Sequence, residues 1–214
     1  MFILFFLMQG WLMSQNNYPK YDFRSPVGFP VLLSGSFGEV RKNHFHSGID
    51  IRTDGESGKP VYAISDGYVS RINISAVGFG KAIYITHPNG YTSVYGHLSR
   101  FNNVIGSWIK NRQYQKESFE IDITAEPDVL PVRKGEIIAY SGNSGSSAGP
   151  HVHFEIRDTP TQETINPLLF GIPVRDNIPP VISNIKIYPL NENSLVNFSN
   201  NAIILPFRCI ILTR

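Results

Sequence analysis

The 214-residue sequence contains one cysteine, no long apolar run and no concentration of basic residues. Its single cysteine, Cys209, excludes a disulfide within the chain and a zinc site built on cysteine pairs. Any bound metal would therefore take its ligands from His, Asp and Glu. The net charge of +2, without a basic run, does not indicate a nucleic-acid partner.

The longest apolar stretch lies at the N-terminus, over residues 2–8 and, with small breaks, as far as Met13. It is shorter than the roughly 20 residues that span a bilayer, and it fits the apolar region of a secretory signal peptide. No Lys or Arg precedes it. We expect residues 1–14 to be a signal peptide, with export to the periplasm or cell envelope and no stable membrane insertion after cleavage.

Glycine and proline are abundant, with 18 and 15 residues, which favours turns and short strands over long helices. The stretch "KAIYITHPNGYTSVYGHL" alternates around an Asn-Gly turn, as a β-hairpin does. "PVYAISDGYVSRINIS" indicates two strands around an Asp-Gly turn, and "RKGEIIAYSGNSGSSAGPHVHFEIRD" indicates two strands around a Gly/Ser-rich loop. The sequence predicts a mainly β protein with an antiparallel sandwich or barrel-like core and a groove.

The order of these segments predicts the organisation of the chain. An extended segment at 15–34 precedes a core domain at 35–175. An insertion at about 106–131 interrupts that domain, with a short helix at 107–116 and a strand at 119–123. The pair Pro179–Pro180 indicates a linker, so residues 176–214 would be a linker and the start of a second β domain. The extended segment and the insertion are both candidates for covering the groove.

Four of the six histidines lie in two short stretches, "HFHSGIDI" at 44–51 and "GPHVHFEI" at 149–156. On a strand, residues i and i+2 share a face, so His151, His153 and Glu155 would point away from the core. Glu155 could then orient a metal ligand or form an ordinary ion pair. In the first stretch, Gly48 and the β-branched residues around it favour a turn entering a strand over a helix.

His46, Asp50 and one histidine of the second stretch would form a three-ligand metal site. The spacing does not decide whether His151 or His153 is that ligand; the other would be placed to act as general base. Three protein ligands leave a position open, as in catalytic zinc sites, although ligand type alone also permits Co, Mn or Ni. His97, in "YGHLS", is a candidate second active-site histidine that orients water or stabilises an oxyanion.

The remaining histidines, His44 and His87, are expected to have no catalytic role. The loop "SGNSGSSAGP" lacks the phosphate-binding pattern G-x-x-x-x-G-K-[ST] and is expected to form a wall of the groove.

Together, "FHSGIDI", "YGHLS" and "SGNSGSSAGPHVHFEI" resemble the lysostaphin-type (LytM-type) zinc metallopeptidases, a family of peptidoglycan endopeptidases with the duplicated hybrid motif fold. The resemblance covers about residues 35–170. It implies one Zn²⁺ per chain on His46, Asp50 and His153, with His97 and His151 as catalytic histidines and peptidoglycan peptides as substrate. The insertion after Ser99 departs from the family pattern and leaves the substrate preference open. The sequence does not indicate whether the bond that is cut belongs to a D-alanyl–diaminopimelate cross-link or to a glycine bridge. The sequence does not indicate an oligomeric state.

Two other functions remain to be weighed. A catalytically inactive relative would bind the cell wall or activate an amidase, but such relatives usually lack zinc ligands. A biotinyl- or lipoyl-type carrier domain would need a lysine at a hairpin tip, and the turns at Asp66-Gly67 and Asn89-Gly90 have none.

Overall fold

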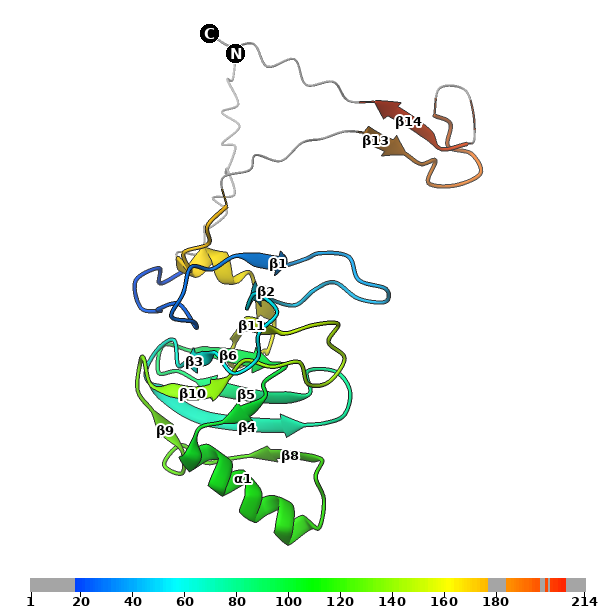
Figure 1. Ribbon diagram of the computed structural model, residues 1–214. Coiled ribbons are helices and arrows are strands. Elements are labelled where there is room, and N and C mark those ends of the chain that lie inside the picture. Colours follow the sequence, from blue (N-terminus) through cyan, green and yellow to red (C-terminus); the bar gives the residue numbers. More distant parts are fainter. Residues whose placement is uncertain (1–17, 177–183, 197–198, 200, 207–214) are drawn as a thin grey trace, which may run out of the picture. The chain divides into compact units, whose positions relative to one another are not determined.

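The computed structural model describes residues 18–176, 184–196, 199 and 201–206 (Figure 1). The expected signal peptide at residues 1–14, the pair Pro179–Pro180 and Cys209 lie outside these described residues. The chain divides into two compact units, Met1–Arg175 and Asp176–Arg214. In the part of the chain that the structure describes, no helix has the length and apolar character needed to cross a bilayer.

The first unit is built on a nine-stranded sheet in which neighbouring strands run antiparallel. Its strands, in spatial order, are β1 (Leu33–Gly35), β2 (Ile49–Arg52), β11 (His151–Asp158), β6 (Tyr91–Gly96), β5 (Lys81–Thr86), β4 (Gly67–Ile74) and β8 (Ile121–Thr124), with β12 (Thr164–Ile165) beside β11 and β9 (Pro131–Val132) beside β4. A second sheet joins β3 (Pro60–Tyr62), β10 (Ile137–Tyr140) and β7 (Arg100–Phe101). The prediction of a mainly antiparallel β protein is confirmed, and the described sheets do not close into a barrel.

One apolar core joins the two sheets. Tyr95 of β6 and Phe154 of β11 are fully buried, pair directly across the strands and share a core cluster with Ile138 of the smaller sheet. A short 3₁₀ helix, η1 (Pro167–Phe170), adds the buried ring of Phe170 to the same cluster. Burial of this apolar surface holds β11 and its neighbours in a fixed register.

The two predicted strand pairs around glycine turns form differently. β5 and β6 make the expected antiparallel hairpin, with Gly90 of its turn at φ 86°. β3 and β4, on either side of Asp66-Gly67, form as strands but belong to different sheets. The Asp-Gly sequence therefore marks a passage between the sheets and does not close a hairpin.

The insertion extends the large sheet away from the groove. Helix α1 (Asn103–Lys116) begins earlier than predicted, because the side chain of Asn102 accepts a hydrogen bond from the backbone N–H of Ile105 at 2.8 Å and caps the first turn. α1 buries Ile105 and Ile109, and β8 then pairs with the edge of β4 (Figure 1).

The N-terminal extended segment packs into the core instead of spanning the groove. Phe23, Val27 and Val31 are buried in the apolar cluster, and Val27 forms a β-bridge with Val61. Among the described residues of this segment, Ser34 reaches the lining of the groove, and the insertion contributes no lining residue. These placements do not fit the expectation that either segment covers the groove.

The second unit contains β13 (Asn184–Ile187), which pairs antiparallel with β14 (Ile203–Pro206). Ile185 and Ile204 of this ribbon are 42% and 59% exposed, so the described strands bury little apolar surface of their own.

Candidate metal centre

A groove of about 670 Å³ lies on the large sheet, on the face opposite the main core. Alternation along β11 separates the two faces, because Phe154 points into the core while its neighbours His153 and Glu155 point the other way, as the sequence predicts. All five histidine and aspartate residues predicted for the site line this groove: His46, Asp50, His97, His151 and His153.

The register between β2 and β11 brings the two histidine-rich stretches together. His153 lies directly opposite Asp50, and His46 comes in the turn that enters β2. Gly48 permits this approach, because a Cβ at that position would overlap the backbone carbonyl of Phe154. The four-residue spacing between His46 and Asp50 is therefore that of a turn and a strand, as expected, and not that of a helix.

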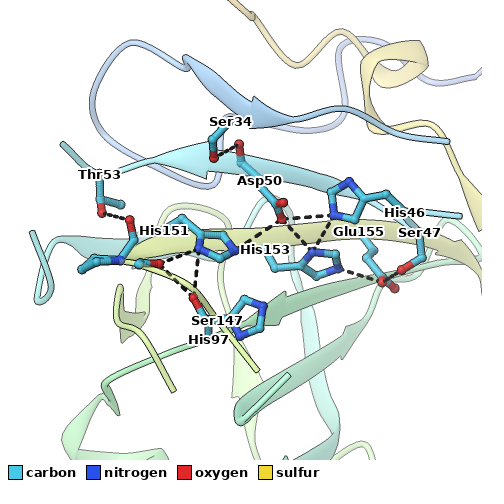
Figure 2. A network of polar contacts seen from close by, with 12 residues as sticks. Ser34, His46, Ser47, Asp50, Thr53, His97, Ser147, His151, His153 and Glu155 are labelled. Atoms are coloured by element: carbon cyan, nitrogen blue, oxygen red, sulfur yellow. Dashed lines mark hydrogen bonds and ion pairs between the residues drawn. The ribbon is translucent and has the colours of Figure 1, made fainter. Parts of the chain in front are cut away.

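Three ligand atoms converge at the centre of the groove (Figure 2). His46 Nε2 lies 3.1 Å from His153 Nδ1 and 3.1 Å from Asp50 Oδ1, and His153 Nδ1 lies 3.0 Å from the same oxygen. Ligand atoms about 2.0–2.1 Å from a tetrahedral zinc ion lie roughly 3.3 Å from one another. The spacing of these atoms therefore fits one small divalent cation.

The partners on the outer side of each ring fix which ring nitrogen carries the proton. His46 Nδ1 donates to the backbone carbonyl of Ser36 at 2.8 Å, and His153 Nε2 donates to the Glu155 carboxylate at 2.9 Å. In the neutral rings, the inward nitrogens then carry lone pairs. Two lone pairs and a carboxylate oxygen within 3.1 Å form a set of acceptors without a donor, which a metal cation satisfies.

The surrounding charges favour a cation at this point. Burial alone raises the pKa of the Asp50 carboxyl, but its contacts with His151, His153 and His46 outweigh burial and hold that pKa well below its ordinary value. Burial lowers the pKa of His153, but the carboxylates of Asp50 and Glu155 outweigh it and leave the pKa raised. The same negative surroundings that bind a proton at His153 bind a metal ion, and the two compete.

The other two predicted histidines face the same centre from separate elements. His151 Nδ1 donates to the Gly149 carbonyl at 2.8 Å, so its Nε2, 3.4 Å from Asp50 Oδ1, carries a lone pair in the neutral ring. His97 Nδ1 donates to the Ser144 carbonyl at 2.8 Å, and the ring lies 4.6 Å from the His151 ring between centroids. The loop "SGNSGSSAGP" supplies both carbonyls and lines the groove, as predicted.

His97 reaches the groove through its backbone conformation. The residue follows the last residue of β6 and has φ 58°, in the left-handed region. Burial lowers the pKa of His97 to about 4, against the contribution of its hydrogen bond to Ser144. For His151, burial lowers the pKa, but the contacts with Asp50 and Gly149 outweigh it and leave the pKa above its ordinary value.

Glu155 makes both kinds of contact that the sequence left open, one with a candidate metal ligand and one with an arginine. Its side chain is fully buried, accepts from His153 and forms an ion pair with Arg157 at 2.6 Å. Ser47, in the turn that carries His46, donates a hydrogen bond to the same carboxylate (Figure 2).

Sequence reasoning missed two side chains beside the site. The ring of Phe79 stacks on His153, 4.7 Å between centroids, and meets His97 edge-on at 6.3 Å. Arg41 forms an ion pair with Asp50 at 2.9 Å. Neither belongs to a pattern of ligand spacing, so the signal for both lies in the tertiary contacts.

The two histidines without an expected catalytic role are placed differently. His44 is exposed at the rim of the groove, where its Nδ1 lies 2.7 Å from the Asn43 side chain. His87 is buried away from the groove, with its ring nitrogens 2.8 Å from the Asp66 carbonyl and 2.8 Å from Ser93 Oγ.

The sequence matches the model of peptidase family M23 over residues 44–114 and 129–167, which include all five predicted site residues. A relative named uncharacterized metalloprotease, from Haemophilus influenzae, is 34% identical over 156 residues, which cover 70% of this chain and 27% of the relative. The DD-carboxypeptidase/endopeptidase Mpg of Neisseria meningitidis is 31% identical over 128 residues, which cover 60% of this chain and 23% of that relative. Lysostaphin of Staphylococcus simulans is 29% identical over a match that covers 68% of this chain and 22% of that relative. The matched region thus spans about a quarter of the length of these curated relatives.

Solved structures share the fold. The catalytic domain of the prophage-encoded M23 protein EnpA from Enterococcus faecalis, solved as a variant, has a TM-score of 0.50 and 27% identity, covering 70% of this chain and 98% of that one. A zinc containing peptidase from Vibrio cholerae has a TM-score of 0.50 at 23% identity, and the match covers 68% of this chain and 39% of that chain. The resemblance to lysostaphin-type peptidases is confirmed. The chain belongs to peptidase family M23 and carries the metalloendopeptidase domain of that family.

Proposed function

We propose that this protein is a zinc-dependent endopeptidase that hydrolyses peptide cross-links of bacterial peptidoglycan. The observation that carries the proposal is the acceptor-only cluster of His46, Asp50 and His153, within 3.1 Å of one another, with two further histidines facing it. Relatives named endopeptidases, such as Mpg and lysostaphin, support the reaction class.

His46 Nε2, Asp50 Oδ1 and His153 Nδ1 would hold one zinc ion per chain. Two imidazole nitrogens and one carboxylate oxygen form a donor set typical of catalytic zinc. When bound, zinc polarises the scissile carbonyl and makes the attacking water more acidic. Phe79, stacked on His153, restricts the movement of this ring and excludes water from one side of it.

His151 is proposed as the general base. In the neutral ring its Nε2 lone pair faces the ligand cluster, so it can accept a proton from the attacking water and return it to the leaving amine. The Gly149 carbonyl holds Nδ1–H throughout and stabilises the protonated ring once it forms.

His97 is proposed to orient the attacking water. Its Nδ1–H is committed to the Ser144 carbonyl, which leaves Nε2 as an acceptor, and its low pKa keeps the ring neutral at pH 7. A neutral ring in this tautomer accepts a hydrogen bond from water and has no proton to offer an oxyanion. Of the two roles that the sequence left open for His97, the proposal therefore takes the first.

The complete three-ligand set argues against a catalytically inactive cell-wall-binding or amidase-activating relative. Such a protein would have no use for three convergent ligand atoms and two oriented histidines. Export, through the expected signal peptide at residues 1–14, would bring the protein to its substrate in the periplasm or cell envelope.

The test is digestion of purified peptidoglycan by the purified protein, with zinc and with chelator, followed by mass spectrometry of the released muropeptides. His153→Ala should lose both bound zinc and hydrolysis, and His151→Ala should lose hydrolysis while it retains zinc. His44→Ala, a histidine at the rim outside the cluster, is the matched control and should bind zinc as the wild type does.

Chelator-sensitive loss of cross-linked muropeptides would support the proposal and identify the bond. Wild-type protein without bound zinc and without hydrolysis would refute it and favour the inactive relative. Protein that carries one equivalent of zinc but does not release any muropeptide would contradict peptidoglycan as the substrate.

A further inference from the structure

The two oxygens of the Asp50 carboxylate face different partners. Oδ1 lies 3.1 Å from His46 Nε2 and 3.0 Å from His153 Nδ1, in the proposed ligand cluster. Oδ2 lies 2.9 Å from Nη2 of Arg41, which is not a ligand. A carboxylate can bind a metal through one oxygen or through both, so the partner of Oδ2 bears on the coordination.

The hairpin that precedes His46 holds Arg41 in place. The backbone N–H of Gly38 donates to His46 O at 2.8 Å, and the N–H of His46 donates to Glu39 O at 2.8 Å. The N–H of Arg41 donates to the carbonyl of His44 at 2.9 Å and closes the tip. Arg41 is thus tied to the same hairpin that delivers the ligand His46.

A second ion pair fixes the guanidinium group itself. Arg41 Nη2, the atom that contacts Asp50, also lies 3.1 Å from the Glu39 carboxylate. Arg41 Nε is a buried side-chain atom without a hydrogen-bond partner in the described part of the chain. A buried donor without a partner is unfavourable. The ion pairs with Asp50 and Glu39 therefore hold the guanidinium group in a position where its Nε–H has no hydrogen-bond partner among the described residues.

Gly35 makes room for this contact. A Cβ at Gly35, the last residue of β1, would overlap both Arg41 Nη2 and Asp50 Oδ2. Gly35 does not have a positive φ, so its backbone conformation is open to alanine. What requires glycine here is the space that the ion pair occupies.

From these contacts we infer that Arg41 is a positioning residue that binds Asp50 Oδ2, so that Asp50 presents Oδ1 alone to the metal. The inference rests on the metal site of the proposed function. Arg41 reserves one oxygen and leaves the remaining coordination positions to water and substrate. Gly35 provides the space for the Arg41–Asp50 ion pair. A side chain at Gly35 would therefore disrupt this ion pair, as a substitution of Arg41 would.

The test measures metal binding directly. Zinc affinity of the full chain is measured by competition with a chromophoric chelator, for wild type, Arg41→Gln and Gly35→Ala. Partners of this kind, which orient a ligand, typically change metal affinity by about 10- to 100-fold, and we expect both variants to fall in that range. Arg133→Gln, an exposed arginine outside the groove, and Gly106→Ala, with open space around it, are the matched controls.

A spectroscopic readout separates positioning from general damage. The visible bands of the cobalt-substituted protein report coordination number and geometry, and we expect them to weaken in Arg41→Gln as Oδ2 joins the metal. Thermal unfolding of the metal-free proteins is the folding control. The Arg41–Asp50 pair is 36% exposed at the arginine and 13% at the aspartate, so Arg41→Gln should unfold somewhat below wild type and still be folded at the temperature of the binding assay.

The outcomes distinguish this inference from the proposed function. Wild type that binds zinc, with Arg41→Gln equal in affinity and cobalt spectrum, would overturn the role of Arg41 and leave the zinc site intact. Wild type that does not bind zinc would overturn the proposed function and this inference with it. Weaker binding and altered cobalt bands in Arg41→Gln, with controls unchanged, would support the role.

Discussion

Replacing Glu155 by glutamine should weaken both the metal site and the fold. The carboxylate is fully buried and accepts from three donors: His153 Nε2 at 2.9 Å, the Arg157 guanidinium at 2.6 Å and Ser47 Oγ. Glutamine has the same shape but one acceptor oxygen, and its NH₂ group must face one of these donors. At least one buried donor then loses its partner, and Arg157 loses its counter-charge.

The magnitude follows from the two losses. A buried donor left without a partner costs about 1–3 kcal/mol, and breaking a fully buried ion pair costs about 3–5 kcal/mol. Because the Arg157 side chain is 18% exposed and can turn toward water, we expect the free energy of unfolding to fall by about 2–3 kcal/mol. His153 also loses the carboxylate that fixes its tautomer, so zinc affinity should fall by about 10- to 100-fold, equivalent to about 1.4–2.7 kcal/mol.

Urea unfolding of the metal-free protein measures the first quantity, and chelator competition measures the second. Glu163→Gln makes the same chemical change at an exposed position and should leave both quantities unchanged. Zinc affinity within twofold of wild type in Glu155→Gln would refute the claim that Glu155 orients His153. A normal unfolding midpoint would refute the account of the buried carboxylate.

Three further predictions concern glycines and a buried histidine. Gly48→Ala should destabilise the protein by about 1–3 kcal/mol and weaken zinc binding, because the added methyl overlaps the carbonyl of Phe154; unchanged urea midpoints would contradict the close approach. Gly106→Ala, in open space within α1, should instead stabilise it by about 0.5–1 kcal/mol, and a loss of stability would argue against the helix. Burial lowers the pKa of His87 below its ordinary 6.5, so the unfolded state binds the extra proton and the stability contributed by the neutral ring is lost as the pH falls below 6.5. His87→Gln should reduce that acid dependence by up to about 1.4 kcal/mol per pH unit, measured as unfolding free energy at several pH values; an identical dependence in the variant would refute the assignment.

Local patterns in the sequence determined the strands and one face of the site. The alternation in "PHVHFEI" places Phe154 in the core and His153 and Glu155 on the opposite face, because the side-chain period of a strand is two residues. The Asn-Gly turn closes the β5–β6 hairpin, because Gly90 tolerates the left-handed φ of 86° that this turn requires. These features depend on residues close together in the chain, which is why the sequence alone predicts them.

Tertiary structure alone decided what lies around each ligand. The pairing of β2 with β11 sets His153 opposite Asp50, 103 residues apart in the chain, and spacing within either stretch carries no information about that register. The contacts that fix the ring tautomers of His46 and His97 come from backbone carbonyls, which every residue type possesses.

The same reason explains why Arg41 and Gly35 escaped prediction. An arginine two residues after a glutamate, and a glycine at a strand end, are common in any sequence. Only the packing of β1 against the hairpin that carries Arg41 brings the guanidinium onto Asp50 and leaves room for it above Gly35. The sequence therefore determined which residues form the proposed metal site, and the fold decided which of their atoms face its centre.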